Sequence, residues 1–123
     1  MFATLQKNAS LSVLQSRIMR ATVLASEIKA LEADLVTADR MLTAVSFKRG
    51  TDGRFLPRAV RELRDRIKAD TERTIARIDA SLTATRKAYK ATLDLARTTA
   101  RASDLDRNDA AVKGWLYRLG KLN

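Results

Sequence analysis

Cysteine and histidine are both absent from this sequence of 123 residues, and each absence excludes a class of site. Without cysteine there can be neither a disulfide nor a thiolate metal site. Without histidine the chain lacks the commonest general base and the commonest metal ligand. The remaining carboxylates alternate with arginine at helical spacing, as in Asp70 and Arg73, which is typical of exposed ion pairs. We therefore expect no catalytic residue, no metal site and no cofactor, and predict that the protein is not an enzyme.

Residues that break helices are scarce, since the chain has four glycines and one proline. Aromatic residues make up only 5% of it, whereas alanine, leucine and arginine are abundant. Good helix formers with few breakers favour long helices over strands. The predicted fold class is all-α: a long antiparallel two-helix hairpin with coiled-coil-like packing, followed by a short C-terminal amphipathic helix.

Long apolar runs are also missing, and no stretch approaches the roughly 20 apolar residues that a membrane span needs. The first residues, MFATLQKNASLSVLQSR, lack the basic leader and apolar run of a signal peptide. We expect a protein that is not secreted by a signal peptide. Its expected location is the cytoplasm, or a virion or other particle assembled inside the cell.

The hydrophobic pattern predicts one helical domain over residues 1–123. A first helix is expected at about 10–47. Its inward seam follows steps of three and four, which alternate except for a phase slip near Ala21–Leu24: Leu11, Leu14, Ile18, Ala21, Leu24, Ile28, Leu31, Leu35, Ala38, Leu42 and Val45. Gly50, Asp52-Gly53 and Pro57 predict a turn at 48–56, and a small β-ribbon there is the lesser alternative. A second helix is expected at about 57–103, with the seam Val60, Leu63, Ile67, Thr71, Ile75, Ile78, Leu82, Thr85, Tyr89, Leu93 and Ala96.

Residues of about 109–119 should form the third, short helix. Its apolar stripe contains Val112, Trp115, Leu116, Leu119 and Leu122 at helical spacing. Two interpretations remain open for this segment. Trp115 either folds back over the end of the hairpin or anchors the chain in the groove of a partner.

Positive charge dominates the second part of the chain. Residues 1–47 hold five basic and four acidic residues, while residues 48–123 hold nineteen and ten. Such an imbalance suggests an acidic partner. The candidate nucleic-acid contacts are a stripe on one side of the second helix and a group nearer the turn: Arg86, Lys90, Arg97 and Arg101 in the stripe, and Arg49, Arg54, Arg58, Arg61 and Lys68 in the group. Contacts of this kind reach phosphates and do not read sequence.

A set of small residues lies roughly opposite the seam of the second helix. Alanine there is either a helix-forming surface residue or part of a flat face that another helix can approach closely. The candidate interface residues are this alanine face and the third helix: Ala69, Ala76, Ala80, Ala84, Ala88 and Ala91, with Trp115, Leu116 and Leu119.

Two functions fit these patterns. The first is a non-enzymatic assembly or adaptor protein that forms a homo-oligomer or docks into a larger complex, such as a virion, and presents its basic surface to an acidic partner. The alternative is a nucleic-acid-binding accessory protein without sequence specificity. A membrane surface is the least favoured partner, because the third helix is short for that role.

Overall fold

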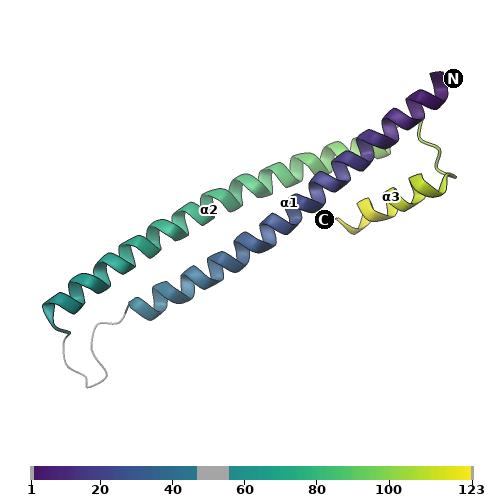
Figure 1. Cartoon of the computed structure of the whole chain (residues 1–123). Coiled ribbons are helices and arrows are strands. Elements are labelled where there is room, and N and C mark those ends of the chain that lie inside the picture. The colour runs from purple at the N-terminus through teal and green to yellow at the C-terminus, as the bar shows by residue number, and fades with distance from the viewer. Residues whose placement is uncertain (1, 47–55, 123) are drawn as a thin grey trace. The chain divides into compact units, whose positions relative to one another are not determined.

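Three helices make up the computed structural model, which describes residues 2–46 and 56–122 (Figure 1). Helix α1 runs over Phe2–Val45, α2 over Arg58–Ala100 and α3 over Ala110–Lys121. The described residues contain no strand, and α1 and α2 pack antiparallel. The predicted all-α hairpin with a short C-terminal helix is therefore confirmed. The predicted turn falls outside the described residues, except for Leu56 at its end.

The helix ends differ from the expected ones in ways that local chemistry explains. Helix α1 begins at Phe2 instead of near residue 10, because residues 2–9 contain no glycine or proline to delay it. Helix α2 begins at Arg58, and the carbonyl of Pro57 accepts from the Arg61 amide at 3.0 Å. Proline thus stands just before the helix, where its missing N–H costs no hydrogen bond.

Packing divides the chain into two compact units, each containing part of α1 and part of α2. Unit 1 consists of residues 1–28 and 85–123, and therefore also contains α3. Unit 2 is the continuous stretch 29–84.

Unit 1 has a core to which all three helices contribute. Its buried residues are Leu14 and Ile18 from α1, Leu93 and Ala96 from α2, Leu105 from the α2–α3 connection, and Val112 and Leu119 from α3. Trp115, Leu116 and Leu122 are partly buried against this core. The whole predicted stripe of α3 therefore faces its own chain, because three elements can enclose side chains that two helices would leave half open.

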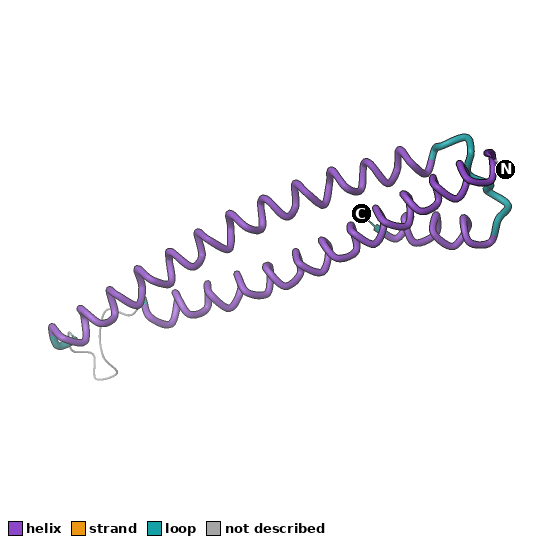
Figure 2. Tube along the Cα trace, turned by 45° about the horizontal axis from the view of Figure 1, so that its top comes forward, coloured by secondary structure: helices purple, strands orange, loops and turns teal. Residues whose placement is uncertain are grey.

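Polar contacts fix the ends of the elements in unit 1. The connection from α2 to α3, drawn in teal in Figure 2, is tied back by Arg107, whose Nη2 donates to the Ala100 carbonyl at 2.8 Å. The Ser10 hydroxyl of α1 donates to the carboxylate of Asp104 in the same connection. Asp109 caps α3, and its side chain accepts from the amides of Ala111 at 2.7 Å and Val112 at 3.4 Å.

Unit 2 is more thinly packed. Its buried residues are Ala38, Thr71 and Leu82, and the other members of the α1 seam are half-buried. Val60, Leu63 and Ile67 were expected to point inward along the α2 seam, but they are exposed. Among the described residues of unit 2 only α1 and α2 are present, so each side chain has neighbours on one side only.

Candidate interaction surfaces

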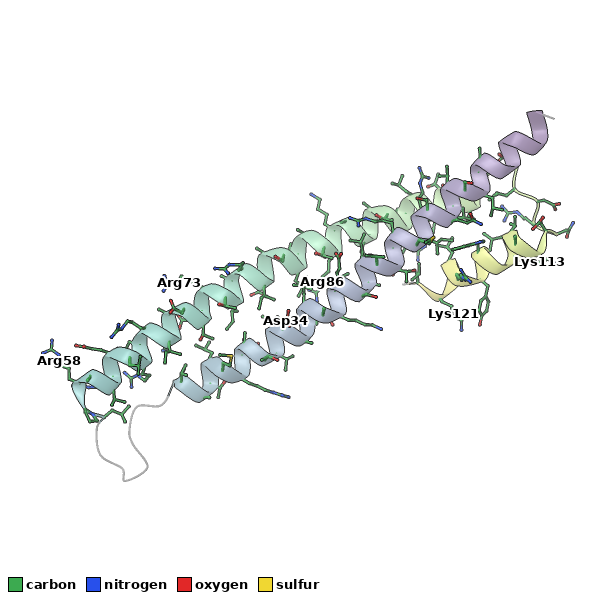
Figure 3. All side chains as sticks on the ribbon, in the orientation of Figure 1. Asp34, Arg58, Arg73, Arg86, Lys113 and Lys121 are labelled. Atoms are coloured by element: carbon green, nitrogen blue, oxygen red, sulfur yellow. The ribbon has the colours of Figure 1, made fainter. Side chains whose placement is uncertain are left out.

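The basic stripe on α2 lies in unit 1 and is exposed along its length. Arg86, Lys90, Arg97 and Arg101 all have exposed side chains (Figure 3 labels Arg86). Asp94 lies beside Arg97, with 4.0 Å between the carboxylate oxygen and the guanidinium. This is a long, exposed pair, which contributes little stability and neutralises the stripe only in part.

Charge is divided unequally between the two units. The sequence of unit 1 holds twelve basic and five acidic residues, a net charge of +7, whereas unit 2 holds twelve and nine, a net charge of +3. Unit 1 therefore produces most of the positive field of the molecule.

The second group of predicted basic contacts belongs to unit 2. Arg58 pairs with Glu62 at 3.0 Å, while Arg61 and Lys68 are exposed. Arg49 and Arg54 lie outside the described residues. Further arginines of this unit are engaged with neighbouring carboxylates, as in Arg64 with Asp65 at 2.9 Å. Ion pairs of this kind reduce the charge that is available to a partner.

The alanine face of α2 is largely accessible, whereas the predicted interface residues of α3 are buried or half-buried. Ala69, Ala76, Ala80, Ala84 and Ala91 are exposed, and Ala88 is half-buried. Leu119 is buried in the core of unit 1, and Trp115 and Leu116 pack against that core. Trp115 packs in part against the core of its own chain, and the rest of its surface lines the groove described next.

A groove between α1 and α3 in unit 1 was not predicted. It has a volume of 530 Å³. Its lining residues are Ile18, Met19, Thr22 and Val23 of α1, Trp115, Arg118 and Lys121 of α3, and Leu122, which caps α3. The guanidinium of Arg118 lies 4.4 Å from the centre of the Trp115 ring, and the Lys121 ammonium lies 5.0 Å from that of Tyr117. Met19 and Val23 widen the apolar face of α1 beyond its seam, which was the only sequence signal for this groove.

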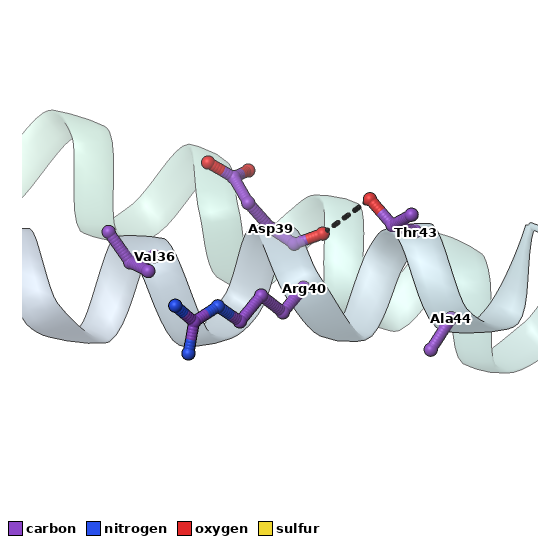
Figure 4. A pocket seen from close by; sticks show the side chains of 5 residues that line it. All are labelled: Val36, Asp39, Arg40, Thr43 and Ala44. Carbon is purple, nitrogen blue, oxygen red and sulfur yellow. Dashed lines mark hydrogen bonds between the residues drawn. The ribbon is translucent and has the colours of Figure 1, made fainter.

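Two smaller hollows lie in unit 2. One has a volume of 430 Å³, and the described residues that line it all belong to α1: Val36, Asp39, Arg40, Thr43 and Ala44 (Figure 4). The Thr43 hydroxyl donates a hydrogen bond to the Asp39 carbonyl of the same helix at 3.0 Å. The other, of 280 Å³, lies between α1 and α2 and is lined by Ala38, Met41, Ile67, Asp70, Thr71 and Thr74.

Within the described residues, no group of three or more acidic side chains is placed to hold a metal ion. No helix among the described residues is both long enough and apolar enough to cross a membrane. Comparison with protein-family models, with curated proteins and with solved structures finds no match to this chain.

Proposed function

We propose that this chain is a non-enzymatic assembly or adaptor protein, which associates with copies of itself or docks into a larger complex and presents a basic surface to an acidic partner. The observation that carries the proposal is the apolar surface left open in unit 2. Met41 is 53% exposed and Ile67 is 39% exposed, and the two side chains line the same hollow between α1 and α2. Adjacent exposed apolar side chains mark sites of protein–protein contact.

Unit 2 has further exposed apolar side chains outside this hollow. Val36 on α1 and Leu63 on α2 are also large, apolar and exposed. The alanine face of α2 adds a flat strip where a helix can approach closely. A virion or another multi-subunit particle is a setting in which such a hairpin would be covered by its neighbours.

Light-scattering mass after size exclusion tests this proposal. The unmodified chain should form a defined oligomer at both low and high salt. The double variant M41E/I67E should shift that mass toward the monomer, because it places two carboxylates on the apolar surface. The variant A33E is the matched control, since Ala33 is exposed on the side of α1 opposite its seam and lines none of the hollows described above. A monomer at every concentration of the unmodified chain would contradict the proposal.

The alternative function is nucleic-acid binding without sequence specificity, and the net charge of +7 on unit 1 favours it. Lys90, Arg97 and Arg101 are exposed on one side of α2 and would contact phosphates. The double variant R97E/R101E should then lose retention on a random DNA duplex while keeping its mass. Retention of the unmodified chain should fall steeply with salt, since phosphate contacts release counterions.

A matched control separates this alternative from a general effect of charge. The variant R58E removes a cation that is paired with Glu62 in unit 2. It should therefore weaken DNA retention less than a single change at Arg101. Equal losses from both changes would mean that net charge, and not the basic stripe, governs the binding.

A further inference from the structure

The groove between α1 and α3 has the dimensions of a small-molecule site. Its volume is 530 Å³, within the range of about 300–1,000 Å³ that ligand pockets occupy. Ile18, Val23 and Leu122 supply aliphatic walls, and Trp115 supplies an aromatic one. Met19 is 59% exposed and Val23 49% exposed, so a ligand in the groove would remove apolar surface from water.

The charged side chains among the described residues of the groove are of one sign only. They are Arg118 and Lys121, and none of these lining residues is acidic. Neither cation forms a salt bridge with a described residue, and each lies over an aromatic ring instead. The Arg118 guanidinium lies over the Trp115 ring and pairs with no described carboxylate, so its N–H groups can donate to an anion. The site thus combines an apolar wall with two cations.

We propose that this groove binds a single-chain anionic amphiphile, specifically a long-chain carboxylate. The alkyl chain lies against Met19, Val23 and Trp115, and the carboxylate accepts hydrogen bonds from Arg118 and Lys121. Charge-assisted hydrogen bonds to a carboxylate fix the orientation of the ligand, and the apolar wall provides most of the affinity.

Two other occupants fit the groove less well. A second copy bound at the same groove about a two-fold axis would bring the Arg118 and Lys121 cations of both chains together, and like charges repel. A protein partner needs about 800 Å² of surface and 20–30 residues on each side, whereas eight residues line this groove. The proposal concerns α1 and α3 of unit 1, and it does not depend on the apolar surface of unit 2.

The protein carries its own probe for this binding, because Trp115 lines the groove and is the only tryptophan of the chain. Dodecanoate, titrated into the full chain below its micelle-forming concentration, should change the tryptophan fluorescence and saturate at one molecule per chain. Dodecyltrimethylammonium, which has the same chain and a cationic head, should bind at least about tenfold more weakly. Acetate, which lacks the chain, should have no effect.

Variants distinguish the head-group contact from the chain contact. R118Q/K121Q should weaken dodecanoate binding about tenfold or more and remove its preference over the cationic amphiphile. V23D should prevent binding by placing a carboxylate where the chain lies. K113Q, which removes a cation of α3 that does not line the groove (Lys113 and Lys121 are labelled in Figure 3), should bind as the unmodified chain does. Circular dichroism must show unchanged helicity for each variant and for each saturated complex.

Several outcomes would overturn the proposal. Equal binding of the anionic and the cationic amphiphile would remove the role of the two cations. So would full binding by R118Q/K121Q. A response to anionic vesicles or to an acidic amphipathic peptide, without one to dodecanoate, would assign the groove to a membrane surface or to a protein. The molecular mass from light scattering tests the proposed assembly separately. If the chain is a monomer that binds dodecanoate, the groove proposal holds and only the assembly proposal fails.

Discussion

A single side chain, Arg17, links α1 to α2 in unit 1. Arg17 on α1 reaches across to α2, where its Nη1 donates to the Leu95 carbonyl at 3.1 Å and to the hydroxyl of Thr99. The Thr99 hydroxyl in turn donates to the same Leu95 carbonyl at 3.0 Å. The two bonds from Arg17 help to set the register of the helices, because a shift of α1 along α2 by one residue would break both, whereas the Thr99 bond lies within α2.

Replacing Arg17 by methionine should therefore destabilise the fold. Methionine keeps much of the aliphatic length but cannot donate, so we expect the free energy of unfolding to fall by about 1.5–3 kcal/mol, the value for hydrogen bonds to charged groups. Urea denaturation followed by circular dichroism measures the change. Arg20→Met, at an exposed position on the same helix, is the control and should cost less than about 0.5 kcal/mol.

Leu14 makes the apolar counterpart of this prediction. Its side chain is 0% exposed in the core of unit 1. Leu14→Ala leaves a cavity and should lower the free energy of unfolding by about 2–5 kcal/mol. Val13 is the neighbouring exposed position, so Val13→Ala should change it by no more than about 0.5 kcal/mol in the same urea titration. Equal effects of the two changes would mean that the core of unit 1 is packed differently.

At the scale of the helices, the stability of α3 depends on its N-cap residue, Asp109. The Asp109 carboxylate accepts from two amides that have no partner within the helix. Asp109→Ala should lower the free energy of unfolding by about 1 kcal/mol, and Asp109→Asn should restore most of it, because asparagine is also a good N-cap. Urea titrations monitored by Trp115 fluorescence report on this helix directly. If both substitutions lower the free energy of unfolding equally, the negative charge of Asp109, and not its capping hydrogen bonds, stabilises the helix.

The elements themselves could be predicted because their signals are local. The α1 seam from Leu11 to Val45 is buried or half-buried throughout, as its three-four spacing indicates. The stripe of α3 likewise lies on the core of unit 1. The exposure of Val60, Leu63 and Ile67 in the α2 seam could not be predicted. The hydrophobic period shows which side of a helix faces its partner, but it does not show how completely a residue on that side is buried.

The groove was harder to foresee than any helix. Met19 and Trp115 are far apart in the sequence, and a helical repeat read along one element does not reveal which faces of two elements meet. The cation–π pair of Arg118 and Trp115 follows from their i, i+3 spacing on α3, yet its place at the edge of a groove does not. The basic stripe, the alanine face and the single-domain organisation stay predictions until function and stability are measured.

For the whole molecule, the unequal packing of the two units predicts unequal local stability. Hydrogen exchange should be slowest for amides in the part of α2 that contributes Leu93 and Ala96 to the core of unit 1. Amides near Leu63 and Ile67 should exchange faster, because few buried apolar contacts resist local opening there. Exchange measured by mass spectrometry on the full chain gives both rates. The proposed assembly would cover this surface, so the contrast should be fully seen in the M41E/I67E variant and be smaller in the oligomer. Equal protection in that variant would contradict the unequal packing of the two units.

The division of the sequence between the two units also decides when each unit is complete during translation. Residues 29–84 are continuous, so unit 2 has all its parts once that stretch has left the exit tunnel. Unit 1 joins residues 1–28 to residues 85–123, and its long-range contacts, such as Ser10 with Asp104, must wait for the second stretch. Leu14 and Ile18 are therefore synthesised well before the residues that bury them in the core of unit 1. Until residues 85–123 emerge, their apolar side chains stay exposed on the nascent chain, where they can associate with other apolar surfaces.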